Sequence, residues 1–299
     1  SDAAACSPQT LERRAPDLLL LLDRSGSMTN QVDDSACPIG AVDAGTCVRK
    51  WEEVTKAINQ VVAETESSLR WGLKYFPNDL TCGIQPGVAV AVGTKSAAAI
   101  AASIVTNAPM AGRTPTRFAV ASTGEYLNGL HDGNPKVVLL ATDGLPTCTP
   151  GLPSSSVPDM PGTVAAIKAI ADSGIPVYVI GIGNIATGTA TLNEMATAGG
   201  RPRAADPAYY PVESRQTLVE ALHTIGAQTG VCSYALPSVP SKPSDVIIST
   251  SGLVIPRDVA HAEGWDYDAA MNSIQLYGTW CAKDKMAALT GVLATQLCR

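Results

Sequence analysis

Residues 17–28 of this 299-residue chain read DLLLLLDRSGSM. Five consecutive leucines between two aspartates are typical of a strand buried on both faces, as in the middle of a parallel sheet. Asp23, Ser25 and Ser27 follow at alternate positions, and Gly26 lets the backbone turn where the strand ends. Because ligands of open α/β sheets bind at the carboxyl ends of the strands, we expect these three side chains to face a crevice.

Carboxylate and hydroxyl oxygens suit a hard divalent cation such as Mg²⁺. An Asp-x-Ser-x-Ser pattern is equally compatible with a helix cap or a solvated turn, so it does not establish a metal site by itself. Two later stretches add to it. Residues 112–116 read GRTPT and open a helical stretch, and residues 136–144 read KVVLLATDG, a second buried strand that ends in Asp-Gly.

In this order, the three stretches resemble the von Willebrand factor A (vWA) family and its metal-ion-dependent adhesion site. The resemblance covers residues 17–229 and implies a doubly wound, mostly parallel α/β sheet of Rossmann-like type, with one antiparallel edge strand. It also implies a divalent cation, Mg²⁺ first and Mn²⁺ or Ca²⁺ as alternatives, held by Asp23, Ser25, Ser27, Thr114 and Asp143. Thr116 is the weaker candidate, because the family's ligand is the first threonine of the pair and a hydroxyl at a helix start is explained by capping.

The rest of this region alternates short apolar runs with helical spacing, as an α/β sheet covered on both faces requires. Further strands are expected at 71–76, 88–92, 175–183 and 209–212, and helices at 51–68, 96–106, 115–130, 163–172, 189–198 and 214–229. In vWA domains the strands at 71–76 and 88–92 form the hairpin with the antiparallel edge. Gly181 and Gly183 lack the third glycine of a nucleotide-binding loop, so they predict close backbone packing near the site.

The character of the sequence changes at Gly230. Short apolar runs at 246–250, 253–256 and 273–277, separated by turn residues, predict a small β-rich unit. We therefore expect a polar leader at 1–16, a vWA domain at 17–230 and the β-rich unit at 231–299. Residues 264–268 (GWDYD) are expected in a loop between strands, with the tryptophan packed and the aspartates forming turns; a cation site is the alternative. A similar tail follows vWA domains in some secreted bacterial proteins.

Eight cysteines without Cys-x-x-Cys spacing, and three scattered histidines, favour disulfides over a zinc site. An even count suits an oxidising compartment, so the chain is expected to be secreted, periplasmic or at the cell surface. A start at Ser1 without an apolar leader fits removal of a signal peptide, and no stretch is long enough for a transmembrane helix.

The closeness of Cys37 and Cys47 favours a local loop beside the metal site. On the implied fold, Cys82 and Cys148 both follow carboxyl ends of strands and are expected to pair. Cys6–Cys232 and Cys281–Cys298 are the remaining predicted bonds, chosen among about a hundred connectivities. Asp33, Asp34 and Asp43 lie in the same loop region and are interpreted as solvated carboxylates, with a second cation site as the alternative.

A net charge of −6 and the lack of a Lys/Arg cluster argue against a nucleic-acid partner. The resemblance implies a non-enzymatic adhesion module that binds an acidic side chain of a protein partner through the cation. One alternative is a structural surface protein in which the C-terminal unit binds and the vWA domain is a scaffold. A metal-dependent hydrolase is a weaker alternative, because no histidine lies near the motifs and no Gly-x-Ser-x-Gly elbow occurs.

Overall fold

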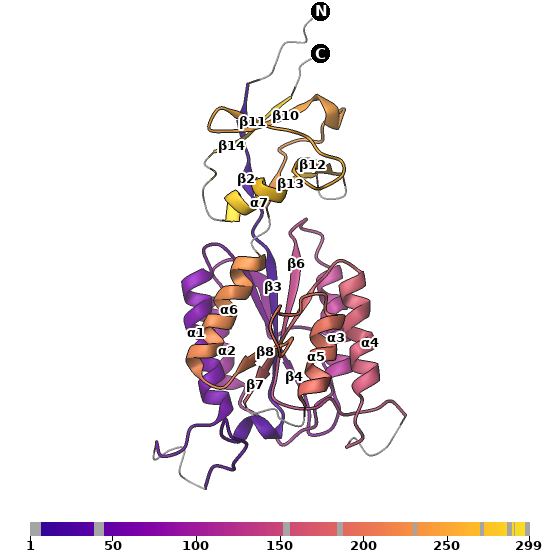
Figure 1. Cartoon of the computed structure of the whole chain (residues 1–299). Coiled ribbons are helices and arrows are strands. Elements are labelled where there is room, and N and C mark those ends of the chain that lie inside the picture. Colours follow the sequence, from indigo (N-terminus) through magenta and orange to yellow (C-terminus); the bar gives the residue numbers. More distant parts are fainter. Residues whose placement is uncertain are drawn as a thin grey trace, which may run out of the picture. The chain divides into compact units, whose positions relative to one another are not determined.

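A computed structural model describes residues 7–38, 45–151, 156–183, 188–229, 232–269, 272–285, 289 and 291–296. The chain divides into two compact units, which we call the α/β unit and the β unit (Figure 1). The α/β unit comprises residues 17–131 and 136–226. The β unit comprises residues 1–16, 132–135 and 227–299.

The α/β unit is built on a six-stranded sheet with the order β5-β4-β3-β6-β7-β8. Its strands are β3 (Asp17–Asp23), β4 (Arg70–Phe76), β5 (Val90–Gly93), β6 (Lys136–Thr142), β7 (Val177–Ile182) and β8 (Tyr210–Val212). All neighbouring pairs are parallel except β4 and β5, which are antiparallel. The predicted doubly wound sheet with one antiparallel edge strand is confirmed.

Among the described residues, six helices cover the two faces of this sheet. They are α1 (Lys50–Thr65), α2 (Ala97–Thr106), α3 (Thr116–Asn128), α4 (Met160–Asp172), α5 (Thr189–Ala198) and α6 (Arg215–Thr229). Helices α1, α2 and α6 lie on one face and α3, α4 and α5 on the other (Figure 1). No helix among the described residues is both long and apolar enough to cross a membrane.

The leucine run of β3 lies between these two helical layers. Leu18, Leu20 and Leu22 pack in the core with α1, α2 and α6, and Leu19 and Leu21 pack in the core with α3, α4 and α5. Each is at most 1% exposed, and burying a leucine side chain contributes about 1.5–3 kcal/mol. The uninterrupted apolar run of β3 is therefore explained by burial on both of its faces.

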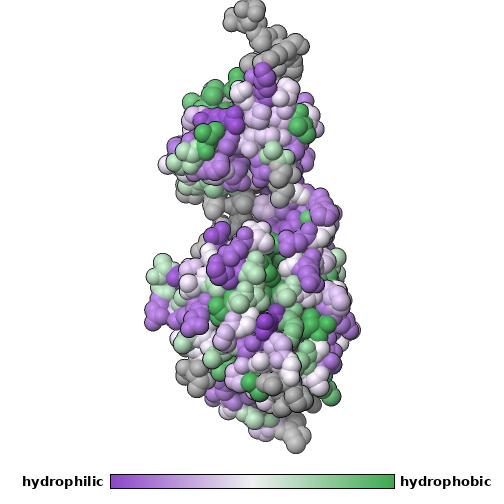
Figure 2. All heavy atoms as spheres, turned by 90° about the vertical axis from the view of Figure 1, so that its right-hand side faces the viewer, coloured by the Kyte–Doolittle hydropathy of each residue, from purple (hydrophilic) through white to green (hydrophobic). Residues whose placement is uncertain are grey.

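On the outer side of α3, α4 and α5, hydrophilic and hydrophobic residues are interspersed (Figure 2).

The β unit contains two four-stranded antiparallel sheets, with the orders β1-β14-β10-β11 and β12-β13-β9-β2. Its elements are β1 (Gln9–Thr10), β2 (Glu12–Arg13), β9 (Ser233–Ala235), β10 (Val246–Thr250), β11 (Leu253–Ile255), β12 (Gly264–Asp268), β13 (Ser273–Tyr277), α7 (Gly278–Lys285) and β14 (Val292–Gln296). Its core includes Trp265, Ile248 and Leu276. The predicted β-rich character is confirmed.

Two expectations about this unit are wrong. The segment before β3 is not a separate leader, because β1 pairs with β14 and β2 pairs with β9. Leu11, between these two strands, is buried in the core of the β unit. Residues 264–268 form strand β12 and not a loop, because every residue from Gly264 to Asp268 has a partner in β13.

Disulfides join Cys37 to Cys47 and Cys82 to Cys148, as predicted. A third bond joins Cys232 to Cys281, so the predictions Cys6–Cys232 and Cys281–Cys298 are wrong. The reason lies in the sheet: Cys232 directly precedes β9, and Cys281 lies in α7, directly after β13. Because β9 and β13 pair, the two cysteines come within 5.3 Å of each other, measured between Cα atoms. Cys6 and Cys298 lie outside the described residues.

Candidate metal centre

The site begins with Asp23, the last residue of β3. Its side chain is fully buried, and both of its oxygens accept hydrogen bonds. The backbone N–H of Ser25 donates to Oδ1 over 2.8 Å, and the Thr142 hydroxyl donates to Oδ2 over 2.6 Å. The first bond lies within the turn that leaves β3, and the second comes from the end of β6. The turn and the neighbouring strand thus fix the orientation of this carboxylate.

Asp143 joins the site because β3 and β6 are parallel neighbours, so their carboxyl ends meet at one edge of the sheet. The Ser27 hydroxyl donates to Asp143 Oδ1 over 2.7 Å, and the hydroxyl oxygens of Ser25 and Ser27 lie 3.4 Å apart. Ser25 precedes the 3₁₀ turn Gly26–Thr29, which contains Ser27. Four of the five predicted ligands are therefore connected by hydrogen bonds.

Thr114, the fifth predicted ligand, comes from the loop before α3 and is buried. A Cβ atom placed on Gly144 would lie 4.0 Å from the Thr114 hydroxyl oxygen and 3.8 Å from that of Ser27, so both hydroxyls border this glycine. Thr147 binds both backbone polar groups of Thr114. The Thr147 hydroxyl accepts a hydrogen bond from Thr114 N–H, and Thr147 N–H donates to the carbonyl oxygen of Thr114. Thr116, by contrast, begins α3, and its hydroxyl faces the carbonyl of Thr114.

Lys50 is a functional candidate that the sequence reasoning missed. It is the first residue of α1, its side chain is wholly buried, and its ammonium donates to Asp143 Oδ2 over 2.9 Å and also to Asp34 Oδ1. The glycine at 183 makes room for it, because a Cβ there would lie 2.7 Å from Lys50 Cε. A lysine at the N-terminus of a helix is unfavourable because its charge opposes the helix dipole. This unfavourable position is the feature of the sequence that could have marked Lys50 as a functional residue.

The carboxylates of the insertion after β3 have separate positions. Asp34 is exposed, as expected of a solvated loop carboxylate, and it also contacts the Lys50 ammonium beside the site. Asp33 is exposed and accepts hydrogen bonds from Ser35. Asp43 lies outside the described residues.

The electrostatics of the site favour a cation. Burial, reinforced by the nearby Asp143, raises the pKa of Asp23 to about 7. Burial also raises the pKa of Asp143, although Lys50 opposes this effect. For Lys50, burial disfavours the charged form, but Asp143 and Asp34 outweigh it and hold its pKa above the ordinary value. The protein alone therefore leaves the negative charge of Asp23 poorly compensated.

The donor set fits a hard divalent ion. Two carboxylates and three hydroxyls offer only oxygen atoms, which is the ligand chemistry of Mg²⁺, Mn²⁺ and Ca²⁺. Within the described part of the chain, no group of three or more His, Cys, Asp and Glu side chains is placed to hold a metal. A soft-ligand site of the zinc type is therefore not present among those residues.

The disulfide between Cys82 and Cys148 supports the site from its side. Cys148 follows Thr147, the residue that holds Thr114, and Cys82 lies in the loop after β4. The bond thus ties the loop after β6 to the loop after β4. We expect this link to limit the motion of Thr114.

Comparisons with known proteins agree with the fold. Solved structures similar to the chain include the PilB minor pilin from Streptococcus sanguinis, with a TM-score of 0.53 and 14% identity over 73% of this chain and 62% of that one. The open conformation of the pilus adhesin SpaC from Lactobacillus rhamnosus GG matches with a TM-score of 0.51 and 14% identity, over 96% of this chain and 39% of that one. The manganese-loaded TRAP protein from Plasmodium vivax matches with a TM-score of 0.50 and 16% identity, over 75% of this chain and 78% of that one.

The chain thus spans about three fifths of the length of PilB and about two fifths of that of SpaC. A comparison with curated proteins gave no significant match. The model of the von Willebrand factor type A domain family matches residues 17–223, which include every element from β3 to β8 and all five predicted ligands. The chain belongs to the von Willebrand factor type A domain family.

Proposed function

We propose that the chain is a cation-dependent binding module that holds a divalent cation, with Mg²⁺ as the first candidate, and through it a carboxylate of a protein partner. One observation carries the proposal: five oxygen-bearing side chains from three separate segments lie together, and one of them, Asp23, is a buried carboxylate whose charge the protein does not compensate. The cation would be held by Asp23, Ser25, Ser27, Thr114 and Asp143.

When bound, the cation supplies a positive charge that attracts a carboxylate to its open coordination position. The protein's own groups prepare that position. Ser25 N–H and Thr142 orient Asp23, and Lys50 engages one oxygen of Asp143 while the other faces Ser27. We therefore expect Asp143 to present a single oxygen, Oδ1, to the cation side of the site.

Binding is favoured over catalysis by the surroundings of the site. None of the three histidines is beside the ligands: His223 in α6 contacts Glu64 of α1, His261 lies in the β unit beside Asp266, and His131 is exposed. Metal-assisted hydrolysis needs a base close to the metal, and we therefore propose a non-enzymatic role.

An extracellular or surface location is part of the proposal. The described part of the chain contains three disulfides, and disulfides persist in oxidising compartments. Structures with a similar fold include a minor pilin, a pilus adhesin and a manganese-loaded protein, which is consistent with adhesion through a cation.

The decisive experiment is calorimetric titration of Mg²⁺, Mn²⁺ and Ca²⁺ into chelator-stripped protein. We expect saturable binding of at least one ion, lost in Asp23→Ala and retained in Asp172→Ala. Asp172 is a matched control because it is an exposed aspartate at the end of α4. Equal binding by the wild type and Asp23→Ala would refute the assignment of the site.

A further inference from the structure

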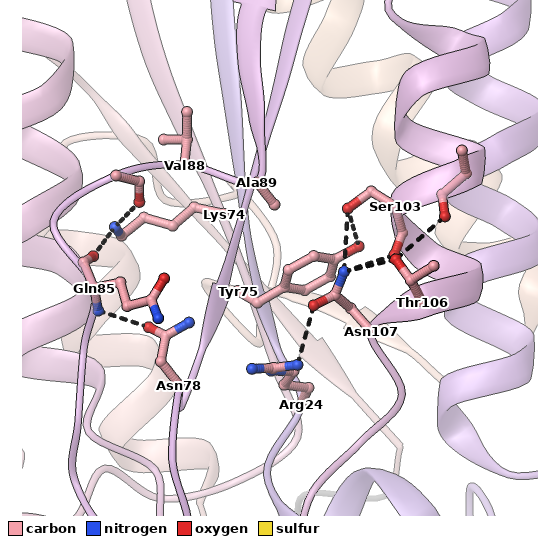
Figure 3. A pocket seen from close by; sticks show the side chains of 12 residues that line it. Arg24, Lys74, Tyr75, Asn78, Gln85, Val88, Ala89, Ser103, Thr106 and Asn107 are labelled. Carbon is pink, nitrogen blue, oxygen red and sulfur yellow. Dashed lines mark hydrogen bonds between the residues drawn. The ribbon is translucent and has the colours of Figure 1, made fainter.

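A cavity in the α/β unit that is lined by none of the five proposed metal ligands lies at the outer edge of β4. Strand β5 pairs with β4 only at Trp71 and Leu73, so the outer edge beyond Leu73 is not covered by a strand. A cavity of about 610 Å³ opens there, between the loop after β4 and helix α2 (Figure 3). This volume lies within the range of small-molecule sites.

The lining of the cavity has a distinctive composition. It contains two cationic side chains, three carboxamides, a tyrosine and two hydroxyls, and no carboxylate, in a chain whose net charge is −6. The residues with the polar groups that matter most are Arg24, Lys74, Tyr75, Asn78, Gln85 and Asn107. A lining rich in hydrogen-bond donors and without negative charge favours an anionic ligand.

Arg24 is the group that would meet the anion. Only 9% of this residue is exposed, and its guanidinium lies 5.5 Å from the centre of the Tyr75 ring. Nε donates to the carbonyl of Pro77 over 2.9 Å, and one terminal nitrogen donates to Asn107 Oδ1 over 3.3 Å. The other terminal nitrogen points across the cavity, toward the side occupied by Asn78 (Figure 3). Arg24 is thus held in place with donors to spare.

Lys74 supplies charge without free donors. Its ammonium donates to the carbonyls of Gln85, Pro86 and Gly87 and so fixes the loop that closes the cavity. Burial lowers the pKa of Lys74, and Glu125 opposes this only at a distance. No carboxylate among the described residues forms an ion pair with Arg24 or Lys74. Two buried cations therefore line one cavity without an ion-pair partner among the described residues, an arrangement that an entering anion would stabilise.

Asn78 adds a second donor opposite Arg24. Its Oδ1 accepts from the backbone N–H of Gln85 over 2.8 Å, which leaves its NH₂ group for the cavity. Ser103 and Thr106 contribute hydroxyls from α2, while the aliphatic part of the lining is limited to Val88, Ala89 and Ala102. A ligand here must bring many polar groups and little apolar surface.

We propose that this cavity binds an acidic saccharide, with the carboxylate of a uronic-type sugar between Arg24 and Asn78 and the sugar hydroxyls on the surrounding amides and hydroxyls. A sugar acid combines the single anionic group with the several hydroxyls that the lining calls for. The site shares no residue with the proposed cation site, so it does not rest on that proposal.

The test is titration of glucuronate into the full chain in the presence of a chelator, followed by protein-observed NMR. Glucose serves as the matched neutral sugar and acetate as the matched anion without hydroxyls. We expect saturable chemical-shift changes on adding glucuronate. The affinity for glucuronate should be at least about tenfold higher than the affinity for glucose or for acetate, because a charged hydrogen bond adds to the neutral ones. Equal affinities for glucuronate and acetate, or for glucuronate and glucose, would overturn the saccharide assignment.

The test variant is Asn78→Asp, which keeps the acceptor for the Gln85 N–H but places a negative charge in the cavity. We expect it to weaken glucuronate binding by about tenfold or more, with an unchanged thermal midpoint as the check on folding. Arg24→Gln should have the same effect on binding. Lys168→Gln removes an exposed positive charge from α4 and should leave glucuronate affinity unchanged. Undiminished binding by both Asn78→Asp and Arg24→Gln would remove this cavity as the binding site.

Discussion

Lys50 lies within 2.9 Å of a carboxylate that we assign to the cation, so its positive charge opposes a bound divalent ion. Removal of the Lys50 ammonium should strengthen metal binding. It should also lower the stability of the metal-free protein, because Asp34 and Asp143 would lose the positive charge that they share. We therefore expect the Lys50 side chain to lower the affinity of the site for the ion and to stabilise the site when the ion is absent.

We expect Lys50→Met to raise Mg²⁺ affinity by about tenfold, which corresponds to about 1.4 kcal/mol at the screening usual near protein groups. The thermal midpoint of the metal-free variant should fall, and the increase on adding Mg²⁺ should exceed that of the wild type. Calorimetry and thermal unfolding measure both effects, with Lys168→Met as the exposed control. An unchanged Mg²⁺ affinity would show that Lys50 has only a structural role.

Asp23 gives the site a pH dependence whose sign can be worked out. In the metal-free protein its pKa is raised to about 7, chiefly by burial, whereas an aspartate in the unfolded chain titrates near pH 4. Between these values the folded protein holds a proton that the unfolded chain has released. The stability contribution of this group is therefore fully present below about pH 4 and is lost as the pH rises toward about 7.

The cation must displace this proton, so we expect apparent Mg²⁺ affinity to rise between about pH 5 and about pH 7 and to level off above about pH 8. Titrations in two buffers with different ionisation enthalpies should show release of close to one proton per ion near pH 6 and of none above about pH 8. A pH-independent affinity with no proton release would contradict the buried, proton-binding state of Asp23.

At the scale of elements, the site depends on how three loops at the carboxyl edge of the sheet are held together. The disulfide Cys82–Cys148 closes a separation of 66 residues, and its second cysteine follows Thr147, which holds Thr114. The disulfide Cys37–Cys47 closes only 10 residues, within the insertion after β3. In the chain-entropy model, the longer loop gives the larger stabilisation, about 4 kcal/mol against about 3 kcal/mol.

The double variant Cys82→Ser with Cys148→Ser should therefore lose more unfolding free energy than Cys37→Ser with Cys47→Ser. It should also bind Mg²⁺ more weakly, because Thr114 loses the support that Thr147 receives from the disulfide. Chemical denaturation and calorimetry on the two double variants provide the comparison. If the shorter loop proves to be the more important for Mg²⁺ affinity, the insertion and not Thr114 controls the site.

At the scale of the whole molecule, the chain contains a β unit that is completed by its own N-terminal segment. Strands β1 and β2 pair with β14 and β9, and Leu11 between them is 5% exposed in the core of that unit. The two units have separate hydrophobic cores. A defect in one core should therefore leave the local stability of the other unchanged.

We expect Leu11→Ala to lower the local unfolding free energy of the β unit by about 2–4 kcal/mol, the usual cost of truncating a buried leucine. Hydrogen exchange should accelerate at the amides of β9 and β14 and remain unchanged in β3 and β6. Leu253→Ala, at an exposed leucine of β11, is the matched control and should have little effect. Faster exchange throughout both units would show that they unfold together.

The sequence by itself determined the framework of the α/β unit. The apolar runs of β3 and β6, the helical spacing between them, and the oxygen-bearing residues after each run are local consequences of burial and of where a strand leaves the core. Because these patterns are local, they predicted the α/β sheet and placed Asp23, Ser25 and Ser27 at the carboxyl end of a strand. The prediction that Thr114 and Asp143 join them came from the resemblance to the vWA family. The pair Cys37–Cys47 followed from the short separation of the two cysteines, and the pair Cys82–Cys148 followed from the fold that the resemblance implied.

Only the tertiary structure decided the contacts between segments that are distant in the sequence. The Lys50–Asp143 ion pair joins residues 93 positions apart, and the cavity beside β4 is closed by a loop that Lys74 fixes. The N-terminal segment belongs to the β unit because β1 and β2 pair with β14 and β9. The bond Cys232–Cys281 arose in the same way from the pairing of β9 with β13. Burial produces a periodic pattern of apolar residues along the chain. Which distant segments come into contact depends on the path of the whole backbone, and no local sequence pattern records it.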